Sequence, residues 1–173
     1  MPVSLYDLTV SSYLQVLEGV TSCLDQGLVH CRETGVDPDM IVGATLSPDM
    51  LSFNFQVQAI THHSVGALAA VKGGSYYAAL EVPERSYVEL QDMILGAQDS
   101  LRTIDPKELN GREGADVTFR YADISIPYTA ENFLLSFAMP NFYFHSTTTY
   151  SILRMKGVPI GKRNYLGQTR VKN

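Results

Sequence analysis

Histidines are the side chains in this sequence best suited to proton transfer near neutral pH. There are four of them, at positions 30, 62, 63 and 145. An imidazole with a pKa of about 6.5 can act as a base or as an acid under physiological conditions. His62 and His145 each lie in a stretch with apolar residues at steps of three and four, the spacing of a helix with one apolar face. We therefore expect both to point into a helical interior and to be the catalytic acid/base pair.

Other polar and aromatic side chains share the helix faces of these two histidines. Gln58 precedes His62 by four residues and Thr149 follows His145 by four, so each pair lies on one face. His63 points about 100° away from His62 around a regular helix and is the reserve candidate. The expected substrate-binding residues are Phe55, Gln58, His63, Tyr143, Thr149 and Tyr150. The alternative for each histidine is a hydrogen-bonded core residue, and the alternative for the tyrosines is aromatic packing between helices.

The same residues argue against a metal site. A catalytic zinc usually has three protein ligands, and two histidines four apart on a helix are a strong sign of one. Here the residue four positions after His145 is Thr149, a poor neutral ligand. Phosphate-binding glycine loops and the G-x-S-x-G nucleophile motif are also absent from the sequence. We expect no metal and no other cofactor; the remaining alternative is a metal held by His62, His63 and His145.

The amino-acid composition indicates the broad class of protein. The chain has 173 residues, a mass of 19.1 kDa, 45% hydrophobic residues and a formal net charge of −5, which suits a single soluble domain over residues 1–173. An acidic chain without a basic stripe is not expected to bind nucleic acid. No apolar run approaches the ~20 residues of a membrane span, so we expect no membrane partner and a cytoplasmic location. Cys23 and Cys31 fit no zinc motif and are interpreted as reduced core thiols.

Helices must position the candidate residues. Apolar periodicity and end signals predict helices over about 4–34, 47–71, 86–104 and 141–156, the second capped by Ser47 with Pro48 at its first position. A helical pattern also starts at Thr129 and is interrupted at Pro140. Alternation over 115–128 predicts a small β-hairpin with a turn at Ala122–Asp123. More than one face of the second helix is apolar, which indicates a helix inside a bundle.

Several short motifs together resemble a known family. They are Ser4-Leu5-Tyr6-Asp7, Ser47-Pro48-Asp49-Met50, Gln56-Val57, Pro140 to His145, Ile152 to Arg154, Gly157, Ile160 to Arg163, and Tyr165 to Gly167. This set resembles an uncharacterised helical family of the DinB/YfiT-like superfamily over nearly the whole chain. The resemblance implies an all-α fold, a four-helix bundle in up-down-down-up order with long loops and a long crossover, and a homodimer.

The resemblance also implies a range of chemistry. Superfamily members include thiol-dependent transferases and isomerases that bind a divalent metal through one histidine on the second helix and an HxxxH pair on the last. His62 and His145 match the first two ligands, whereas Thr149 stands in place of the third. The scaffold and pocket are therefore expected without the complete metal triad.

The predicted function is acid/base chemistry on a small molecule. An isomerase, cyclase or lyase without a metal fits a polar pocket inside an apolar bundle. One alternative is a non-catalytic small-molecule-binding or stress-related protein that kept the bundle after losing the metal site. Another is a divalent-metal, thiol-dependent transferase of the DinB type. If the protein is an enzyme, its expected partner is a small-molecule substrate.

Overall fold

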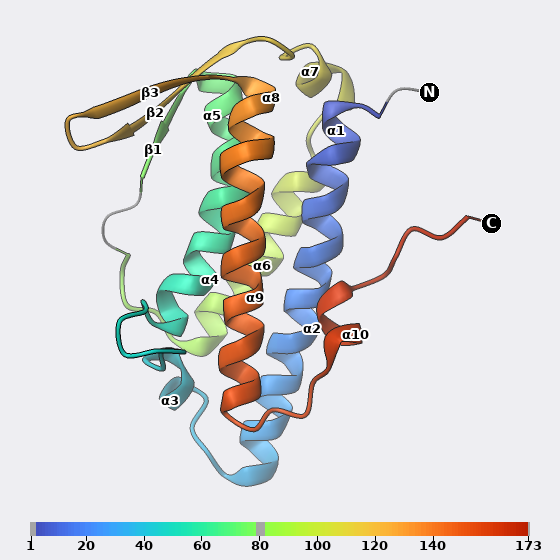
Figure 1. Ribbon diagram of the computed structural model, residues 1–173. Coiled ribbons are helices and arrows are strands. Elements are labelled where there is room, and N and C mark those ends of the chain that lie inside the picture. Colours follow the sequence, from blue (N-terminus) through green and yellow to red (C-terminus); the bar gives the residue numbers. More distant parts are fainter. Residues whose placement is uncertain (1–2, 79–81, 173) are drawn as a thin grey trace.

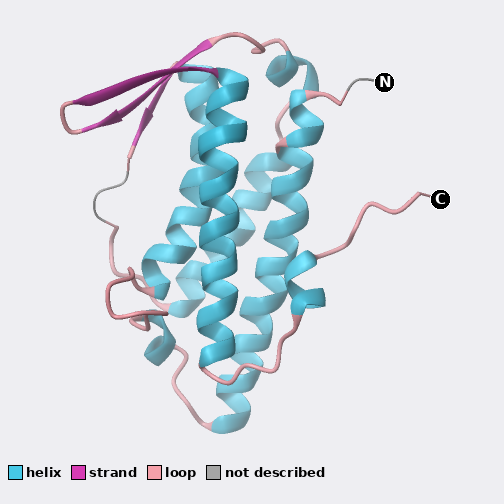
Figure 2. Cartoon of the chain, viewed as in Figure 1, coloured by secondary structure: helices cyan, strands magenta, loops and turns pink. Residues whose placement is uncertain are grey.

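A computed structural model describes residues 3–78 and 82–172 as a mostly helical chain with a small sheet at one end (Figure 1, Figure 2). In chain order the elements are α1 (Leu5–Leu8), α2 (Val10–Thr34), α3 (Asp39–Val42), α4 (Phe53–Thr61), η1 (His62–Gly66), α5 (Ala67–Gly73), β1 (Ser75–Tyr77), α6 (Tyr87–Arg102), α7 (Pro106–Asn110), β2 (Asp116–Tyr121), β3 (Ile124–Thr129), α8 (Ala130–Phe133), η2 (Leu134–Ala138), α9 (Met139–Met155) and α10 (Lys162–Leu166), where η marks a π-helical turn. The prediction of a mostly helical protein is confirmed.

Four long helical segments pack side by side around the core. They are α2, the continuous run α4–η1–α5, α6, and the continuous run α8–η2–α9. Both α2 and α4 pack against α6 and α9, and α10 lies on the outer side of α2. Fully buried aromatic side chains, among them Tyr13, Phe53, Tyr87, Phe133 and Phe142, fill the space between the segments. Among the described helices, none has the length and apolar character needed to cross a membrane.

The second long helix starts five residues later than the sequence pattern predicts. Ser47 does not cap it; its hydroxyl instead donates to Asp49 Oδ1 at 2.6 Å within a turn. The helix begins at Phe53, whose backbone N–H donates to the Ala44 carbonyl at 2.8 Å, and Ser52 is the extended N-cap residue. Local side-chain bonding in the turn competes with helix formation, which is why the serine and proline signals at 47–48 were misleading.

Two π-helical turns interrupt the regular helices. The first, η1, falls in the middle of the second long segment and contains His62 and His63. The second, η2, ends two residues before Pro140, and the helical segment predicted to break at this proline continues through it as α9. A π turn changes the backbone hydrogen-bond spacing, and such a change accommodates a proline that cannot donate an N–H.

The predicted hairpin is present and carries an additional strand. β2 and β3 pair antiparallel, joined at Ala122–Asp123, and Ala122 has a positive φ of 47°. β1 pairs with β2 in parallel, with Tyr76 opposite Phe119. A strand of three residues is too short to show alternation, so the sequence pattern does not predict β1. β1 lies beside α5 (Figure 1), and the ring of Tyr76 packs on the rings of His62 and His63.

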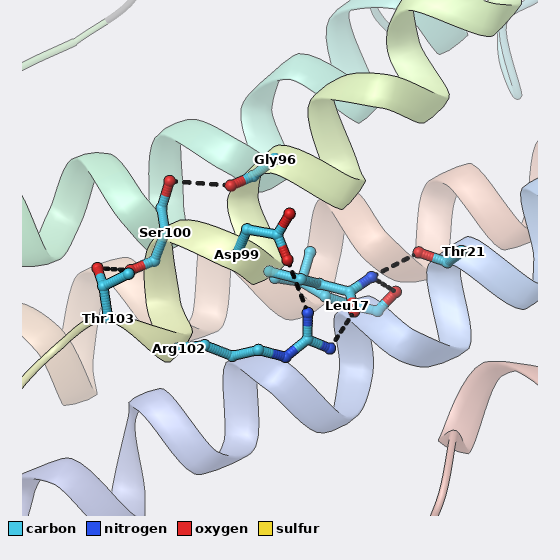
Figure 3. Close-up of polar contacts among 8 residues, drawn as sticks. Leu17, Thr21, Gly96, Asp99, Ser100, Arg102 and Thr103 are labelled. Atoms are coloured by element: carbon cyan, nitrogen blue, oxygen red, sulfur yellow. Dashed lines mark hydrogen bonds and ion pairs between the residues drawn. The ribbon is translucent and has the colours of Figure 1, made fainter.

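Polar contacts join α6 to α2 (Figure 3). Gln98 donates to the hydroxyl of Thr21 at 2.7 Å and accepts from Arg102 at 3.0 Å. Arg102 also pairs with Asp99 at 2.9 Å, although both side chains are largely exposed. These contacts orient Gln98 between the two helices, and we assign them a structural role.

Candidate functional site

A cavity of about 640 Å³ lies between the π turn η1, the sheet and the start of α9. A volume of this size is within the range of small-molecule sites. The described residues that line it are Phe55, Gln58, Ala59, Thr61, His62, His63, Val65, Gly66, Tyr76, Ala78, Val82, Met93, Phe119, Tyr121, Phe137, Asn141 and His145. This set includes three of the four histidines and five phenylalanine or tyrosine rings, but no aspartate, glutamate, lysine or arginine.

His145 is held in one tautomer by an amide on α4. Its Nδ1 lies 2.7 Å from Oε1 of Gln56, and the amide nitrogen of Gln56 donates to the Leu51 carbonyl at 3.0 Å. Because a carbonyl can only accept, the Leu51 contact fixes which end of the amide faces His145. His145 Nδ1 therefore carries the proton and donates it to Gln56, which leaves a lone pair on Nε2. Nε2 has no hydrogen-bond partner among the described residues.

His63 lies directly beside His145. The two ring centroids are 5.4 Å apart and the rings are stacked within 12° of parallel. His63 also packs on Phe137 in an edge-to-face arrangement, with ring centroids 5.7 Å apart. Its Nδ1 lies 3.0 Å from the hydroxyl of Tyr76, a residue that is only 2% exposed.

His62 also lines the cavity, but its ring is hydrogen-bonded to the backbone of β1. Nε2 lies 2.9 Å from the Tyr77 carbonyl, so Nε2 must carry the proton and donate it. The ring packs on Tyr76 with a centroid distance of 4.6 Å. His62 is thus the residue that fastens β1 to η1, and it is His63 that reaches His145. The expectation that His62 rather than His63 faces His145 is corrected here.

All three cavity histidines are held in the neutral form at neutral pH. Burial lowers the pKa of His145 to about 4. Burial, followed by the nearby His145 and His62, lowers the pKa of His63 to about 3. Burial also lowers the pKa of His62, against the opposing effect of its bond to the Tyr77 carbonyl. Burial raises the pKa of the Tyr76 phenol, so this hydroxyl keeps its proton.

The other predicted site residues divide into two groups. Phe55 and Gln58 line the cavity, and the edge of Phe55 lies against His145 at 5.9 Å. Gln58 is engaged by Asn54, by the Pro83 carbonyl and by Arg85, so it joins α4 to the segment before α6.

Three predicted residues on α9 lie outside the cavity lining. Tyr143 is 36% exposed and packs on Phe142. Tyr150 packs on Tyr165 in α10, with ring centroids 5.9 Å apart. Thr149 is 1% exposed, and its hydroxyl has no partner among the described residues. On α9, His145 therefore lines the cavity, whereas Thr149, one turn later on the same face, does not.

The donor set does not fit the metal site that the superfamily resemblance implies. Within the part of the chain that the structure describes, no group of three or more histidine, cysteine, aspartate or glutamate side chains is arranged to hold an ion. Thr149, which stands in the position of the third ligand, is a poor neutral ligand and lies outside the cavity lining. We therefore derive no chemistry through a metal.

Sequence reasoning missed Gln56, Tyr76 and Asn141 as cavity or orienting residues. Gln56 had a usable signal, because it precedes His63 by seven residues and so shares its helix face. Tyr76 had no such signal, because its position depends on the pairing of β1 with a strand more than forty residues later. Asn141 follows the π turn, and this turn changes the helix phase.

Comparison with known proteins supports the resemblance noted from the sequence. The model of a family described as "Domain of unknown function (DUF1993)" matches residues 5–166. A crystal structure of a DinB family member protein from Shewanella denitrificans is 27% identical, with a TM-score of 0.77, and the match covers 98% of this chain and 95% of that one. No curated protein sequence matches. The similarity to the DinB superfamily is confirmed at the level of structure.

Proposed function

The chain belongs to the DUF1993 family, and from this premise we propose that it binds an uncharged small molecule in the cavity and acts on it by acid/base chemistry. The observation that carries the proposal is the lone pair on His145 Nε2, oriented through Gln56 at the wall of a cavity of about 640 Å³. A base held in one tautomer by a second residue is a common arrangement for proton abstraction. Isomerase, cyclase or lyase chemistry suits this arrangement.

The lining supports an uncharged ligand. A carboxylate or ammonium group leaving water for this cavity would meet no described lining residue of opposite charge, and burying an unpaired charge is costly. The rings of Phe55, Tyr76, Phe119 and Phe137 offer flat apolar surfaces, while His63 and Asn141 offer polar contacts. We therefore propose a largely apolar ligand with one or two hydrogen-bonding groups.

A binding protein without catalysis is the second candidate. The low pKa of His145, about 4, makes its imidazole a weak base, and a weak base can still accept a hydrogen bond from a ligand. This candidate predicts ligand binding without conversion.

One experiment separates the two candidates. The full chain is incubated with a panel of uncharged aromatic ketones, lactones and alkenes, and each compound is analysed by chromatography with mass spectrometry before and after incubation. The enzyme proposal expects conversion that falls by about 10²-fold or more in His145→Gln and is retained in His30→Gln. Binding detected by amide chemical shifts, with no conversion of any bound compound, would favour the binding protein.

We also propose that the four packed segments form a DinB/YfiT-like four-helix bundle in up-down-down-up order. The packing of α2 and α4 on both α6 and α9 supports this arrangement. So do the positions of α5 and β1 at one end of the packed segments and of the start of α6 at the other end (Figure 1). The proposed crossover includes β1, and it is this strand that provides Tyr76 to the cavity.

A further inference from the structure

The Tyr76 hydroxyl determines which nitrogen of His63 carries the proton. Tyr76 Oη and His63 Nδ1 are 3.0 Å apart, so one of them donates to the other. Tyr76 is 2% exposed, and its hydroxyl makes no other hydrogen bond among the described residues. If His63 donated, the phenol proton would be buried without an acceptor. Tyr76 is therefore the donor, and the proton of neutral His63 is on Nε2.

The two stacked imidazoles consequently have opposite hydrogen-bonding capacity. His63 presents an N–H at Nε2, and His145 presents a lone pair at Nε2. No hydrogen bond joins the rings to each other, and neither Nε2 has a protein partner in the described part of the chain. Both atoms belong to residues that line the same cavity. A donor and an acceptor are thus available together to one ligand.

This pair suits a carbonyl group and the carbon next to it. A neutral imidazole N–H can stabilise the charge that develops on a carbonyl oxygen during enolisation. A neighbouring imidazole lone pair can remove the proton from the adjacent carbon. No described lining residue is charged, which disfavours a substrate whose carbonyl is flanked by a carboxylate.

We propose that the substrate is an uncharged, enolisable carbonyl compound with an aromatic or other apolar substituent, an inference that rests on the proposed function. The carbonyl oxygen accepts from His63 Nε2–H, and the α-carbon faces His145 Nε2. Tyr76 is a positioning residue that acts through His63.

The proposed step is an isomerisation that needs no co-reactant. His145 Nε2 takes the α-proton, the C–H electron pair forms a C=C bond, and the carbonyl π pair moves to oxygen, where His63 donates its hydrogen bond. The imidazolium of His145 then returns the proton to the oxygen or to a conjugated carbon. The product is an isomer of the substrate, and both histidines end in their starting forms.

The tautomer assignment is tested first, without any substrate. Long-range proton–nitrogen correlation spectra of the ¹⁵N-labelled full chain at pH 7 report which nitrogen of each imidazole carries the proton. We expect Nε2–H for His63 and Nδ1–H for His145. In Tyr76→Phe the His63 Nε2 resonance should move toward the average of the two tautomers. Tyr128→Phe is the matched control, since Tyr128 lies on β3 outside the cavity lining. A His63 ring protonated at Nδ1 in the unmodified protein would overturn the proposal.

The substrate class is tested with benzoylacetone, an uncharged aromatic diketone, and phenylpyruvate, a charged aromatic keto acid. Keto–enol conversion is followed by ultraviolet absorbance. We expect benzoylacetone to be converted faster than in buffer, with a loss of about 10²-fold in His145→Gln and a smaller loss in Tyr76→Phe but not in Tyr128→Phe. Equal acceleration of phenylpyruvate, or a full rate in Tyr76→Phe, would overturn the inference.

Failure of this inference is distinguishable from failure of the proposed function. If benzoylacetone shifts the amide resonances around the cavity but is not converted, the substrate class is wrong while the cavity remains a small-molecule site. If neither benzoylacetone nor any uncharged compound of the panel shifts those resonances, the proposed function itself fails.

Discussion

At the scale of single residues, the orientation of His145 depends on a chain of two hydrogen bonds that starts at the backbone. The Leu51 carbonyl accepts from Gln56, and Gln56 accepts from His145. An amide serves this purpose without introducing charge, so His145 remains neutral and its Nε2 keeps a lone pair. A carboxylate in the same place would stabilise the imidazolium instead.

Gln56→Glu should therefore raise the pKa of His145 from about 4 toward or above the ordinary histidine value of about 6.5. The shift is measured by titrating the His145 ring resonances. Gln58→Glu is the matched control, because Gln58 lies on the same helix and bonds Asn54, the Pro83 carbonyl and Arg85 rather than His145. An unchanged His145 titration in Gln56→Glu would contradict the orientation described here.

The buried histidines should also make stability depend on pH. An unfolded histidine titrates at about 6.5, whereas folded His145 and His63 titrate at about 4 and about 3. Below pH 6.5 the unfolded chain binds more protons than the folded one, so stability is complete above about pH 7 and falls as the pH drops toward 4. The part due to His145 is on the order of 3 kcal/mol.

Urea unfolding between pH 7.5 and pH 4 measures this dependence. His145→Gln should flatten the pH dependence. His30→Gln should leave it in place, because His30 lies near the C-terminal end of α2 and does not line the cavity. If the free energy of unfolding changed with pH equally in His145→Gln and in the unmodified protein, the pKa of His145 would be the same in the folded and unfolded states.

At the scale of elements, both π turns contribute to the wall of the cavity. His62, His63 and Gly66 come from η1, and Phe137 comes from η2. π turns are rare and are often found at functional sites. Each π turn changes the helix phase, and in this protein both turns contain residues that line the cavity.

The C-terminal segment is a second element-scale feature. α10 packs so closely on α2 that a Cβ at Gly19 would overlap the backbone carbonyl of Tyr165. Gln15 also donates to the Leu166 carbonyl at 3.1 Å, so the segment is fixed at more than one point.

Gly19→Ala should release α10 and destabilise the fold by about 1–3 kcal/mol. Gly96→Ala is the matched control, since Gly96 is exposed within α6 and a Cβ there meets nothing within 4 Å. The control should be stabilised by about 0.5–1 kcal/mol, because alanine favours helix more than glycine does. Urea unfolding of both variants checks the difference, and equal stabilities would refute the close contact.

At the scale of the whole molecule, the cavity is assembled from segments far apart in the sequence. α4 and η1 provide one wall, β1 and β2 another, and η2 with α9 a third.

A homodimer remains a prediction at this scale. The outer surfaces of α6 and α9 expose large apolar side chains, including Leu95 at 43% and Phe144 at 54%. Contact between two copies would cover such side chains. Light scattering at micromolar concentration should give twice 19.1 kDa; a monomer mass would rule out a stable dimer.

Much of the architecture could be predicted from local patterns. The helix start at Ser86, the helix end at Lys156 and the hairpin turn at Ala122–Asp123 all appear as expected. These features depend on neighbours within a few residues. The start at Ser47 failed for the same reason, since its local signals are equally compatible with a turn.

The candidate site could also be predicted only in part: local patterns identified several of its residues but not the contacts among them. Sequence patterns identified His145, the His62–His63 pair and Phe55 as residues of a polar site among apolar helices, and these side chains do line one cavity. The partners of each ring could not be derived from spacing. They depend on the helix phase after a π turn and on the pairing of β1 with β2, and both are decided by packing between segments distant in the chain. For this reason His63 rather than His62 lies beside His145, with Gln56 and Tyr76 orienting the two rings.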